Sequence, residues 1–405
     1  MQLRSFTLKN GLTVYVDPKP IGEAGVLLGI NAGYFHEEKT ETAHCTEHIV
    51  AAPTAIYRDD RDPRLTYANR NASTSDIRTC YYFTGLLPQH LSPAIADLRK
   101  IFDPIDVSIL EKQREAVRHE LKGKSFEREL FGLEVNRLLF PRYNARLKTY
   151  RERQERLDAV TGEDIQKFYD KFYSPKNSFI YLGGELSPGI EEEVANTFET
   201  VEHQKNEATE KVVFEPEPPL DMSLTLSREL REDENASVDL VYRVPQFGGD
   251  RLGELAAMVG LERYLAETTG PLYRILREER NLCYTCGTDY TSHMGSAGLF
   301  FLGAQTSASL VEKTRKGILD CLSEVAEKGI PPTYFEVMKY QEAIAKLRRQ
   351  KSLRSGELID WFNRGIDNNE MSDIFQGVSN DTIKAKARYL LESPHVTAIS
   401  LPKKR

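Results

Sequence analysis

The sequence Thr42-Ala43-His44-Cys45-Thr46-Glu47-His48-Ile49-Val50 has two histidines four residues apart and a glutamate directly before the second. On a helix, residues four apart share a face, so His44 and His48 can direct two imidazoles at one metal ion. Glu47 can reach a water on that metal without being a ligand. The pattern His-x-x-Glu-His is typical of zinc sites in which the carboxylate takes a proton from the attacking water. We therefore predict a helix at about residues 41–52 that carries a catalytic zinc site, rather than an exposed helix that holds these residues by chance.

A catalytic zinc ion has three protein ligands and an open position for water, so a third ligand must come from another element. The segment 107–121 is predicted to be helical and contains Glu111, Glu115 and Glu120. We choose Glu120, which comes 72 residues after the second histidine of the motif. The adjacent His119 would point about 100° away. Spacing alone leaves the other two glutamates as alternatives, and a surface carboxylate on a charged helix is the simpler interpretation of each.

Composition excludes some classes of partner. The chain has 405 residues, of which 40% are hydrophobic and 28% are charged, which is typical of a globular protein with two domains. The formal net charge of −7 argues against nucleic acid, whose binders normally present a basic surface.

Cysteine usage and hydropathy bear on the compartment. The 5 cysteines are odd in number and lack framework spacing, which favours a reducing compartment. Cys283-x-x-Cys286 could be a redox pair, but it sits in a strand-like segment and not at the start of a helix, which argues against that role. No apolar run has the length of a signal peptide or of a membrane span. We expect a cytoplasmic protein with no membrane segment, unless a presequence has been removed.

Hydrophobic periodicity predicts the same order of elements twice. In the first half, strands are expected at 12–16, 25–35, 79–86 and 178–183, helices at 41–52, 90–101, 107–121 and 161–172, and a polar loop at 67–75. In the second half, strands are expected at 223–228, 237–244, 297–305 and 396–401, and helices at 250–266, 309–328, 332–349 and 381–391. Ser174-Pro175 and Ser393-Pro394 precede the last strand of each half, which indicates a repeat of pattern.

These elements predict an α+β fold with two similar domains. Residues 202–219 are rich in Glu, Lys and Pro without apolar periodicity, which is typical of a linker. The N-terminal domain would then be 1–201, with the zinc motif, and the C-terminal domain 220–405. Each domain is expected to be a mostly antiparallel sheet with helices packed on one face.

With these motifs the chain resembles the pitrilysin/insulinase-type zinc peptidases, especially the half-length branch that includes mitochondrial processing peptidase and its bacterial relatives. The resemblance covers essentially the whole chain. The opening segment, residues 8–14, is similar to the family's first strand, and His44-x-x-Glu47-His48 matches its metal motif. Asn71-Ala72-x-Thr74, followed by Thr79-x-Tyr81, is similar to the family's active-site edge strand.

The resemblance also implies the metal ligand set. In the family, the distal zinc ligand is the second of two glutamates seven residues apart on a helix, which places it at Glu120 and puts Gln113 where the first usually stands. Gln113 is a departure that weakens a charge orienting the site. Glu41-Thr42-Ala43 is another, because it precedes the motif where the family usually has a glycine-containing turn.

Arg277 and Tyr284 resemble a pair of residues, seven apart, that in the family reaches the active site from the other domain. A guanidinium and a phenol can bind the scissile carbonyl and stabilise the oxyanion that forms during attack. The alternative is a helix end that packs Leu276, Leu282 and Tyr284 into the core while Arg277 is solvated. Asn281 stands where a glycine is common, at a turn.

The resemblance therefore implies a zinc metalloendopeptidase with one Zn²⁺ per chain, held by His44, His48 and Glu120. Glu47 would deprotonate the bound water and later pass the proton to the leaving amine. The main alternative is a non-catalytic or partner-dependent subunit of a heterodimeric peptidase of the same family. A zinc-dependent hydrolase of another substrate class is a third, less favoured interpretation.

A peptide substrate, such as a leader or targeting segment, is expected to add as an extra strand beside Asn71, Ala72 and Thr74. The family encloses its site between four such domains, and this chain offers two. We therefore expect a dimeric chamber, formed by a homodimer or by a heterodimer with a related subunit.

Overall fold

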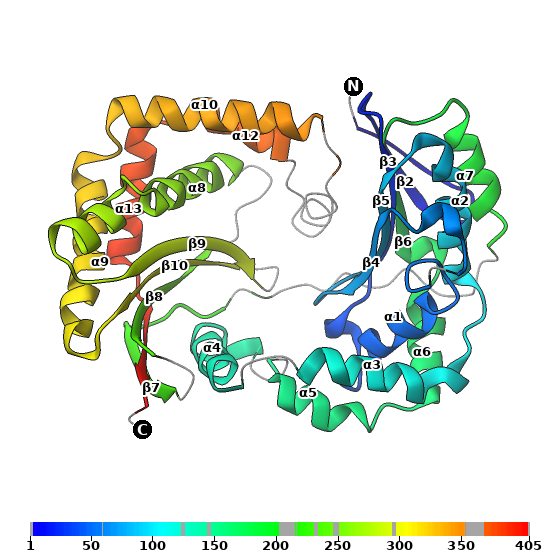
Figure 1. The fold of residues 1–405 in the computed structure, drawn as a ribbon, viewed down its shortest axis with the longest axis horizontal. Helices are drawn as coiled ribbons and strands as arrows, with labels where there is room; N and C mark the ends of the chain where they lie inside the picture. Colours follow the sequence, from blue (N-terminus) through cyan, green and yellow to red (C-terminus); the bar gives the residue numbers. More distant parts are fainter. Residues whose placement is uncertain are drawn as a thin grey trace. The chain divides into compact units, whose positions relative to one another are not determined.

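The computed structural model describes residues 3–58, 60–122, 126–143, 147–201, 215, 217–230, 234–245, 251–293, 297–351, 353 and 368–403 (Figure 1). The chain forms two compact units. Unit 1 comprises Met1–Lys124, Tyr150–Val213 and Leu347–Asn363, and unit 2 comprises Ser125–Thr149, Phe214–Lys346 and Arg364–Arg405. Each unit contains one sheet together with helices, so the predicted α+β class is confirmed. The predicted linker, 202–219, lies largely outside the described residues.

Unit 1 is built on a six-stranded sheet in the order β1-β2-β6-β3-β5-β4. Neighbouring strands are antiparallel except for β2 and β6, which are parallel. β4 lies at one end of this order and is paired with β5. The strands are β1 (Arg4–Thr7), β2 (Thr13–Pro18), β3 (Ala24–Ile30), β4 (Asn69–Thr74), β5 (Thr79–Leu86) and β6 (Ser178–Gly184).

One face of this sheet is covered by helices (Figure 1). Because side chains alternate along a strand, Val26, Leu28 and Ile30 of β3 pack against the helices, whereas Leu27 faces the other way. The covering helices are α1 (Thr42–Ala51), α2 (Leu91–Arg99), α6 (Gly162–Phe172) and α7 (Ile190–Phe198). α3 (Leu110–Lys122) packs on α1, and α5 (Tyr150–Leu157) packs on α3. Short turns of helix are η1 (Tyr34–His36), η2 (Pro63–Leu65), η3 (Pro88–His90), η4 (Lys100–Phe102), η5 (Val107–Ile109) and η7 (Pro175–Asn177).

Unit 2 repeats the strand order of unit 1. Its sheet runs β7-β11-β8-β10-β9, with β7 and β11 parallel and the other pairs antiparallel. This order and these directions match β2-β6-β3-β5-β4, so the predicted repeat is present in the topology. The two Ser-Pro pairs precede the equivalent strands β6 and β11. The strands are β7 (Leu224–Leu230), β8 (Ala236–Pro245), β9 (Thr285–His293), β10 (Ala297–Thr306) and β11 (Val396–Pro402).

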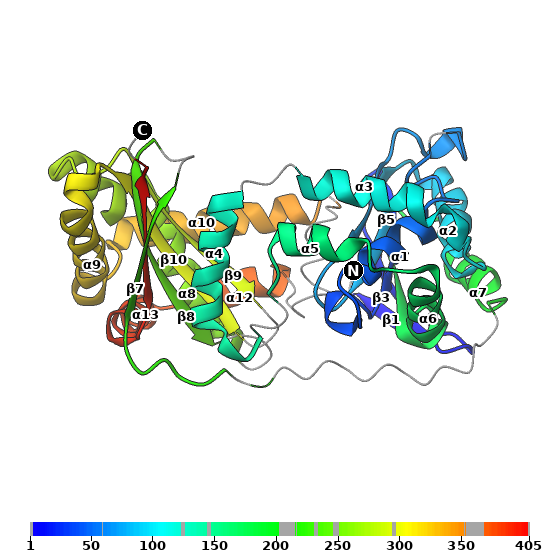
Figure 2. The same cartoon turned by 90° about the horizontal axis from the view of Figure 1, so that it is seen from below.

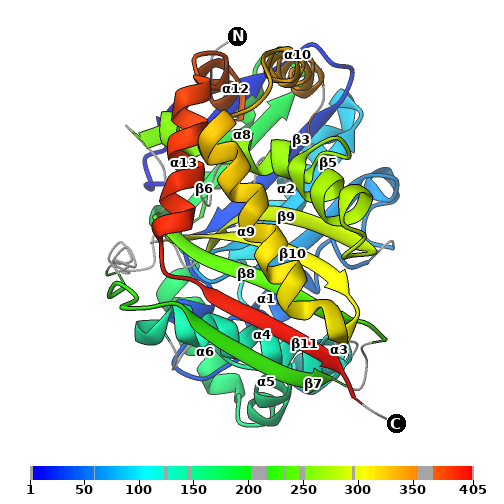
Figure 3. The ribbon, with the colours of Figure 1, turned by 90° about the vertical axis from the view of Figure 1, so that its left-hand side faces the viewer.

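Helices lie on both faces of the unit 2 sheet. α8 (Leu252–Ala266), α9 (Val311–Lys328) and α13 (Asn380–Glu392) cover one face (Figure 3). α4 (Phe126–Leu139) covers the other face (Figure 2), where its apolar side chains contact Val241, Val396 and Ala398. The remaining helical segments are η6 (Pro141–Tyr143), η9 (Leu272–Glu279), η10 (Ala308–Leu310), α10 (Pro332–Arg349) and α12 (Asn368–Gln376).

Two segments cross the predicted domain boundaries. α4 belongs to unit 2 although it precedes residue 201, and Leu353 belongs to unit 1 although it follows residue 220. Leu353 is buried against Leu27, Tyr82 and Tyr181 on the face of the unit 1 sheet that the covering helices leave open. Each unit therefore includes a segment that lies beyond the predicted linker in the sequence.

Most of the predicted elements are present with bounds that differ by a few residues, and α10 has the predicted bounds. The polar loop that the residue pattern predicts at 67–75 is wrong, because Asn69–Thr74 forms β4. The resemblance instead implies an edge strand at Asn71, Ala72 and Thr74, and β4 lies at the end of the strand order. The strand reads Asn-Arg-Asn-Ala-Ser-Thr, which lacks the apolar alternation on which the prediction relied. All 5 cysteines are free thiols. Across the described ranges, no helix combines the length and the apolar character needed to cross a bilayer.

Candidate metal centre

The zinc-motif helix α1 is buried along its whole length. His44, Glu47 and His48 are 8%, 2% and 5% exposed, and their ligand atoms all lie within 4.8 Å of one another. Buried polar groups are costly unless they have partners. The groups that contact these three side chains therefore show how the site is built.

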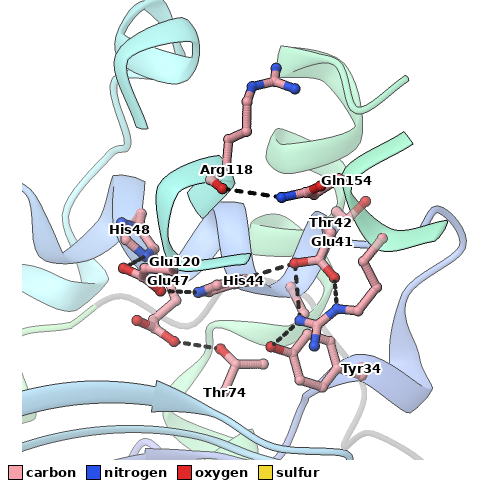
Figure 4. Close-up of polar contacts among 12 residues, drawn as sticks. Tyr34, Glu41, Thr42, His44, Glu47, His48, Thr74, Arg118, Glu120 and Gln154 are labelled. Atoms are coloured by element: carbon pink, nitrogen blue, oxygen red, sulfur yellow. Dashed lines mark hydrogen bonds and ion pairs between the residues drawn. The ribbon is translucent and has the colours of Figure 1, made fainter. Parts of the chain in front are cut away.

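Glu120 of α3 faces both imidazoles (Figure 4). One carboxylate oxygen lies 3.2 Å from Nε2 of His44, and the other lies 3.4 Å from Nε2 of His48. A tetrahedral zinc site with metal–ligand distances of about 2.0–2.1 Å holds its ligand atoms roughly 3.3 Å apart. Two imidazole nitrogens and one carboxylate are also a donor set that catalytic zinc uses. The arrangement and chemistry of these three groups therefore fit a zinc ion.

The two competing glutamates on α3 point elsewhere. Glu111 pairs with Arg114, and Glu115 pairs with Arg118. The helix turns 100° per residue, so only Glu120 is carried to the side that faces α1. Gln113 lies two turns before Glu120 on the same helix and is partly buried.

Glu47 is held as a hydrogen-bond acceptor by two hydroxyl groups. One of its oxygens accepts a hydrogen bond of 2.7 Å from the Tyr57 hydroxyl, and the other accepts one of 2.7 Å from the Thr74 hydroxyl. The Tyr57 ring also lies beside the His48 ring, with centroids 5.4 Å apart. A carboxylate fixed in this way, next to the ligand atoms, is placed as a general base should be.

The other ring nitrogen of His44 has a carboxylate partner. Nδ1 lies 3.0 Å from an oxygen of Glu41, which in turn forms an ion pair with Arg153 of α5. Burial alone would raise the pKa of Glu41, but the hydrogen bonds from His44 and Arg153 outweigh it and lower the pKa.

Electrostatics couple the imidazoles to the carboxylates. Burial opposes a charged His44, but the hydrogen bonds to Glu120 and Glu41 prevail and raise its pKa to about 9. The same contacts from His44 and His48 hold the pKa of Glu120 well below its usual range. Burial raises the pKa of the Tyr57 phenol, which keeps it a hydrogen-bond donor. The imidazole and carboxylate groups of the site therefore attract one another strongly. A metal cation placed among them would bind the same nitrogen and oxygen atoms.

The predicted substrate-binding residues lie on β4. Asn71, Ala72 and Thr74 pair with Tyr82, Tyr81 and Thr79 of β5. Since β4 ends the strand order of its sheet, its backbone offers an edge to an additional strand. The Thr74 hydroxyl on this edge strand donates a hydrogen bond directly to the Glu47 carboxylate.

Arg277 and Tyr284 lie together in unit 2. Nη1 of Arg277 donates a 2.9 Å hydrogen bond to the backbone oxygen of Tyr284, and the guanidinium lies 5.4 Å from the centroid of that ring. The Tyr284 side chain is 72% exposed, whereas Leu276 and Leu282 are buried. Asn281, between them, has a left-handed φ of 49°. The alternative of a packed helix end therefore describes the two leucines but not Tyr284.

Comparisons with known proteins agree with this architecture. The family model "Peptidase M16 inactive domain" matches residues 159–342. The "Uncharacterized zinc protease YmxG" of Bacillus subtilis (strain 168) is 23% identical over 421 residues, which cover 99% of this chain and 98% of that protein. A protease from Helicobacter pylori matches with a TM-score of 0.81 and 19% identity over 99% of each chain. A mutant of the ferredoxin protease FusC, solved in complex with Arabidopsis ferredoxin, matches with a TM-score of 0.70 and 15% identity over 99% of this chain and 48% of that one.

The resemblance to the M16 zinc peptidases is confirmed. The chain matches the protease from Helicobacter pylori over 99% of each chain, and it matches about half of FusC. The M16 region described as inactive begins at residue 159, after the His-x-x-Glu-His motif and Glu120. That description therefore concerns a part of the chain that does not contain the candidate metal centre.

Sequence reasoning missed several residues of the candidate metal centre. Tyr57, Arg153 and the role of Glu41 are visible only in the structure. Glu41 and Tyr57 carry a weak signal, because both flank the motif within ten residues. Arg153 has no such signal in the sequence, because it lies 112 residues from Glu41, the residue that it contacts.

Proposed function

We propose that this chain is a zinc-dependent metalloendopeptidase that cuts extended peptides. The observation that carries the proposal is the position of Glu120, whose two carboxylate oxygens face Nε2 of His44 and of His48 at ligand-to-ligand distances. Glu47 lies beside them, fixed by two hydroxyls. Two similar proteins that are named as proteases, YmxG and the Helicobacter pylori protein, support the same activity.

The residues of the chain have separate tasks in the proposed reaction. One Zn²⁺ per chain, held by His44, His48 and Glu120, would supply a bound water of lowered pKa and polarise the scissile carbonyl. Glu47 accepts a proton from the attacking water and passes it to the nitrogen of the leaving amine.

Substrate is proposed to bind along the edge of β4. An extended peptide that adds there as a strand forms main-chain hydrogen bonds, which selects unfolded segments over folded ones. The FusC structure in complex with ferredoxin supports a peptide or protein substrate for this fold. Arg277 and Tyr284 are proposed to bind the scissile carbonyl, which their mutual contact and the exposure of the Tyr284 ring support.

We propose that the enzyme works as a dimer, either of two copies or with a related subunit. The match of this chain to about half of FusC supports a second half of similar size. Substrates of this assembly would include leader or targeting segments.

The first test measures zinc content and peptide cleavage on the purified full chain. We expect about one zinc per chain and cleavage of a fluorogenic peptide library. Removal of the metal with a chelator should abolish cleavage, and added zinc should restore it. A wild-type protein that binds no zinc would refute the proposal.

Gln113 favours a second candidate, a partner-dependent or non-catalytic subunit. A glutamine in this position carries no charge to orient the zinc ligands. The same measurement separates these cases. A partner-dependent subunit would bind zinc yet cut nothing until a related subunit is added, whereas the metal centre of a non-catalytic subunit would cut nothing even then.

Removing either hydroxyl that holds Glu47 should slow cleavage. Tyr57→Phe and Thr74→Val each delete one hydrogen bond to a carboxylate, and such bonds contribute about 1.5–3 kcal/mol. We expect a kcat about tenfold lower for each variant, with little change in KM or zinc content, measured by steady-state kinetics. Tyr67→Phe is the matched control, because the Tyr67 hydroxyl contacts His90 and the backbone of Leu87 instead. Equal kcat for Tyr57→Phe and Tyr67→Phe would contradict this role.

A further inference from the structure

Glu41 has an uncommon backbone conformation directly before the zinc-motif helix. Its φ of 76° and ψ of 3° are left-handed, a conformation that residues with a side chain rarely adopt. In the ranges that the structure describes, Asn281 is the other non-glycine residue with a positive φ. A conformation of this kind persists where its surroundings enforce it, and such positions cluster at functional sites.

The side chain of Glu41 does not cap α1, although it stands at the N-cap position. The carboxylate of Glu37 does so instead, accepting the backbone N–H groups of Glu41 at 3.1 Å and of Ala43 at 3.0 Å. Glu41 is thereby free to direct its carboxylate along the helix, where one oxygen meets Nδ1 of His44 at 3.0 Å.

The Glu41 carboxylate is fully buried and fixed from its far side. Arg153 donates to one oxygen through Nε and to the other through Nη2, and Nη2 also donates to the Tyr34 hydroxyl at 2.8 Å (Figure 4). A two-pronged contact with a guanidinium allows a carboxylate one orientation. The carboxylate is therefore a rigid acceptor aimed at a single ring nitrogen.

We propose that Glu41 is a positioning residue that sets which nitrogen of His44 faces the metal. By accepting the Nδ1–H of His44 and preventing the ring from rotating, Glu41 leaves Nε2, which faces Glu120, as the nitrogen that gives up its proton to bind a metal. This inference rests on the zinc site proposed above and adds a residue to it. The simpler alternative, an ion pair that only attaches α5 to α1, predicts a loss of stability and no change in zinc affinity.

The test is the zinc affinity of Glu41→Gln, measured by competition with a chromophoric chelator. We expect zinc to bind about 10–100-fold more weakly, because an amide is a poorer acceptor and holds the imidazole less firmly. The double variant Glu41→Gln/Arg153→Gln leaves no unpaired buried charge and should show the same loss. Glu37→Gln is the matched control: it changes a buried carboxylate on the same turn that has its hydrogen bonds to the backbone. It should lower the unfolding temperature and leave zinc affinity within about twofold.

Nitrogen NMR of the zinc-loaded wild-type protein provides a readout that needs no variant. It should show His44 with zinc at Nε2 and a proton at Nδ1. Zinc at Nδ1, or wild-type zinc affinity in either folded Glu41 variant, would overturn the inference while the zinc site stands. A wild-type protein that binds no zinc would overturn the proposed function as well.

Discussion

Glu47→Gln is expected to lower kcat for peptide cleavage by about 10²–10⁴-fold, the range that general acid–base catalysis contributes. An amide cannot accept the proton of the attacking water, yet it has nearly the same shape as the carboxylate. Its oxygen can still accept one of the two hydroxyl hydrogen bonds that Tyr57 and Thr74 donate to Glu47. The ligand set of His44, His48 and Glu120 is unchanged by the substitution. Zinc content should therefore remain at about one per chain while cleavage is lost.

The measurement pairs metal analysis with single-turnover cleavage, so that chemistry is separated from binding. Glu115→Gln is a suitable control, because Glu115 lies on α3, is exposed and pairs with Arg118. It makes the same chemical change on the neighbouring helix and should leave kcat unchanged. A Glu47→Gln protein that retains more than about a tenth of the wild-type kcat would rule out Glu47 as the general base.

The sequence is sufficient for the zinc motif and for most of the strands, because both depend on local pattern. The spacing of His44 and His48 places them on one helix face wherever that helix packs. The buried strands and α10 show clear apolar periodicity, and their bounds were predicted closely. Glu120 was separated from Glu111 and Glu115 only by resemblance, and the structure adds the reason: the other two carboxylates face arginines on their own helix.

The parts that sequence reasoning missed depend on contacts over long separations or on polar edges. β4 is an edge strand with little apolar surface, so its sequence reads as a loop. α5 has one buried side chain, Leu157, and therefore no amphipathic signal. Its residue Arg153 nevertheless reaches Glu41.

The sequence shows two departures from the family pattern, but it does not show what either residue does. Glu41 belongs to a segment where the family usually has a glycine-containing turn, and Asn281 stands where a glycine is common; both residues have left-handed backbones. The sequence indicated the turn at each position, but only the structure shows that one of the two side chains contacts a candidate metal ligand.

Glu120→Gln is expected to weaken zinc binding by more than about 100-fold. Removing a group that is hydrogen-bonded to a metal ligand already weakens metal binding by about 10–100-fold. Glu120 faces the metal position itself, so its loss should have a larger effect. Its carboxylate is also the group that brings a negative charge to the two imidazoles from outside α1. The amide removes that charge and one strong donor atom, so kcat should fall with zinc occupancy and recover in part at high zinc concentration.

Thermal unfolding with and without zinc measures the same loss without any activity assay. A ligand that binds only the folded state stabilises it by RT ln(1 + [L]/Kd), so a 100-fold weaker affinity removes about 2.7 kcal/mol of zinc-dependent stabilisation at saturating metal. The metal-free unfolding temperature is measured for each variant as its own baseline, because Glu120→Gln also removes the attraction of the carboxylate to His44 and His48. Glu115→Gln should keep the full zinc-induced rise in unfolding temperature. If Glu120→Gln keeps that rise while Glu111→Gln or Glu115→Gln loses it, the third ligand is a different glutamate of α3 and the geometry of the centre must be reassigned.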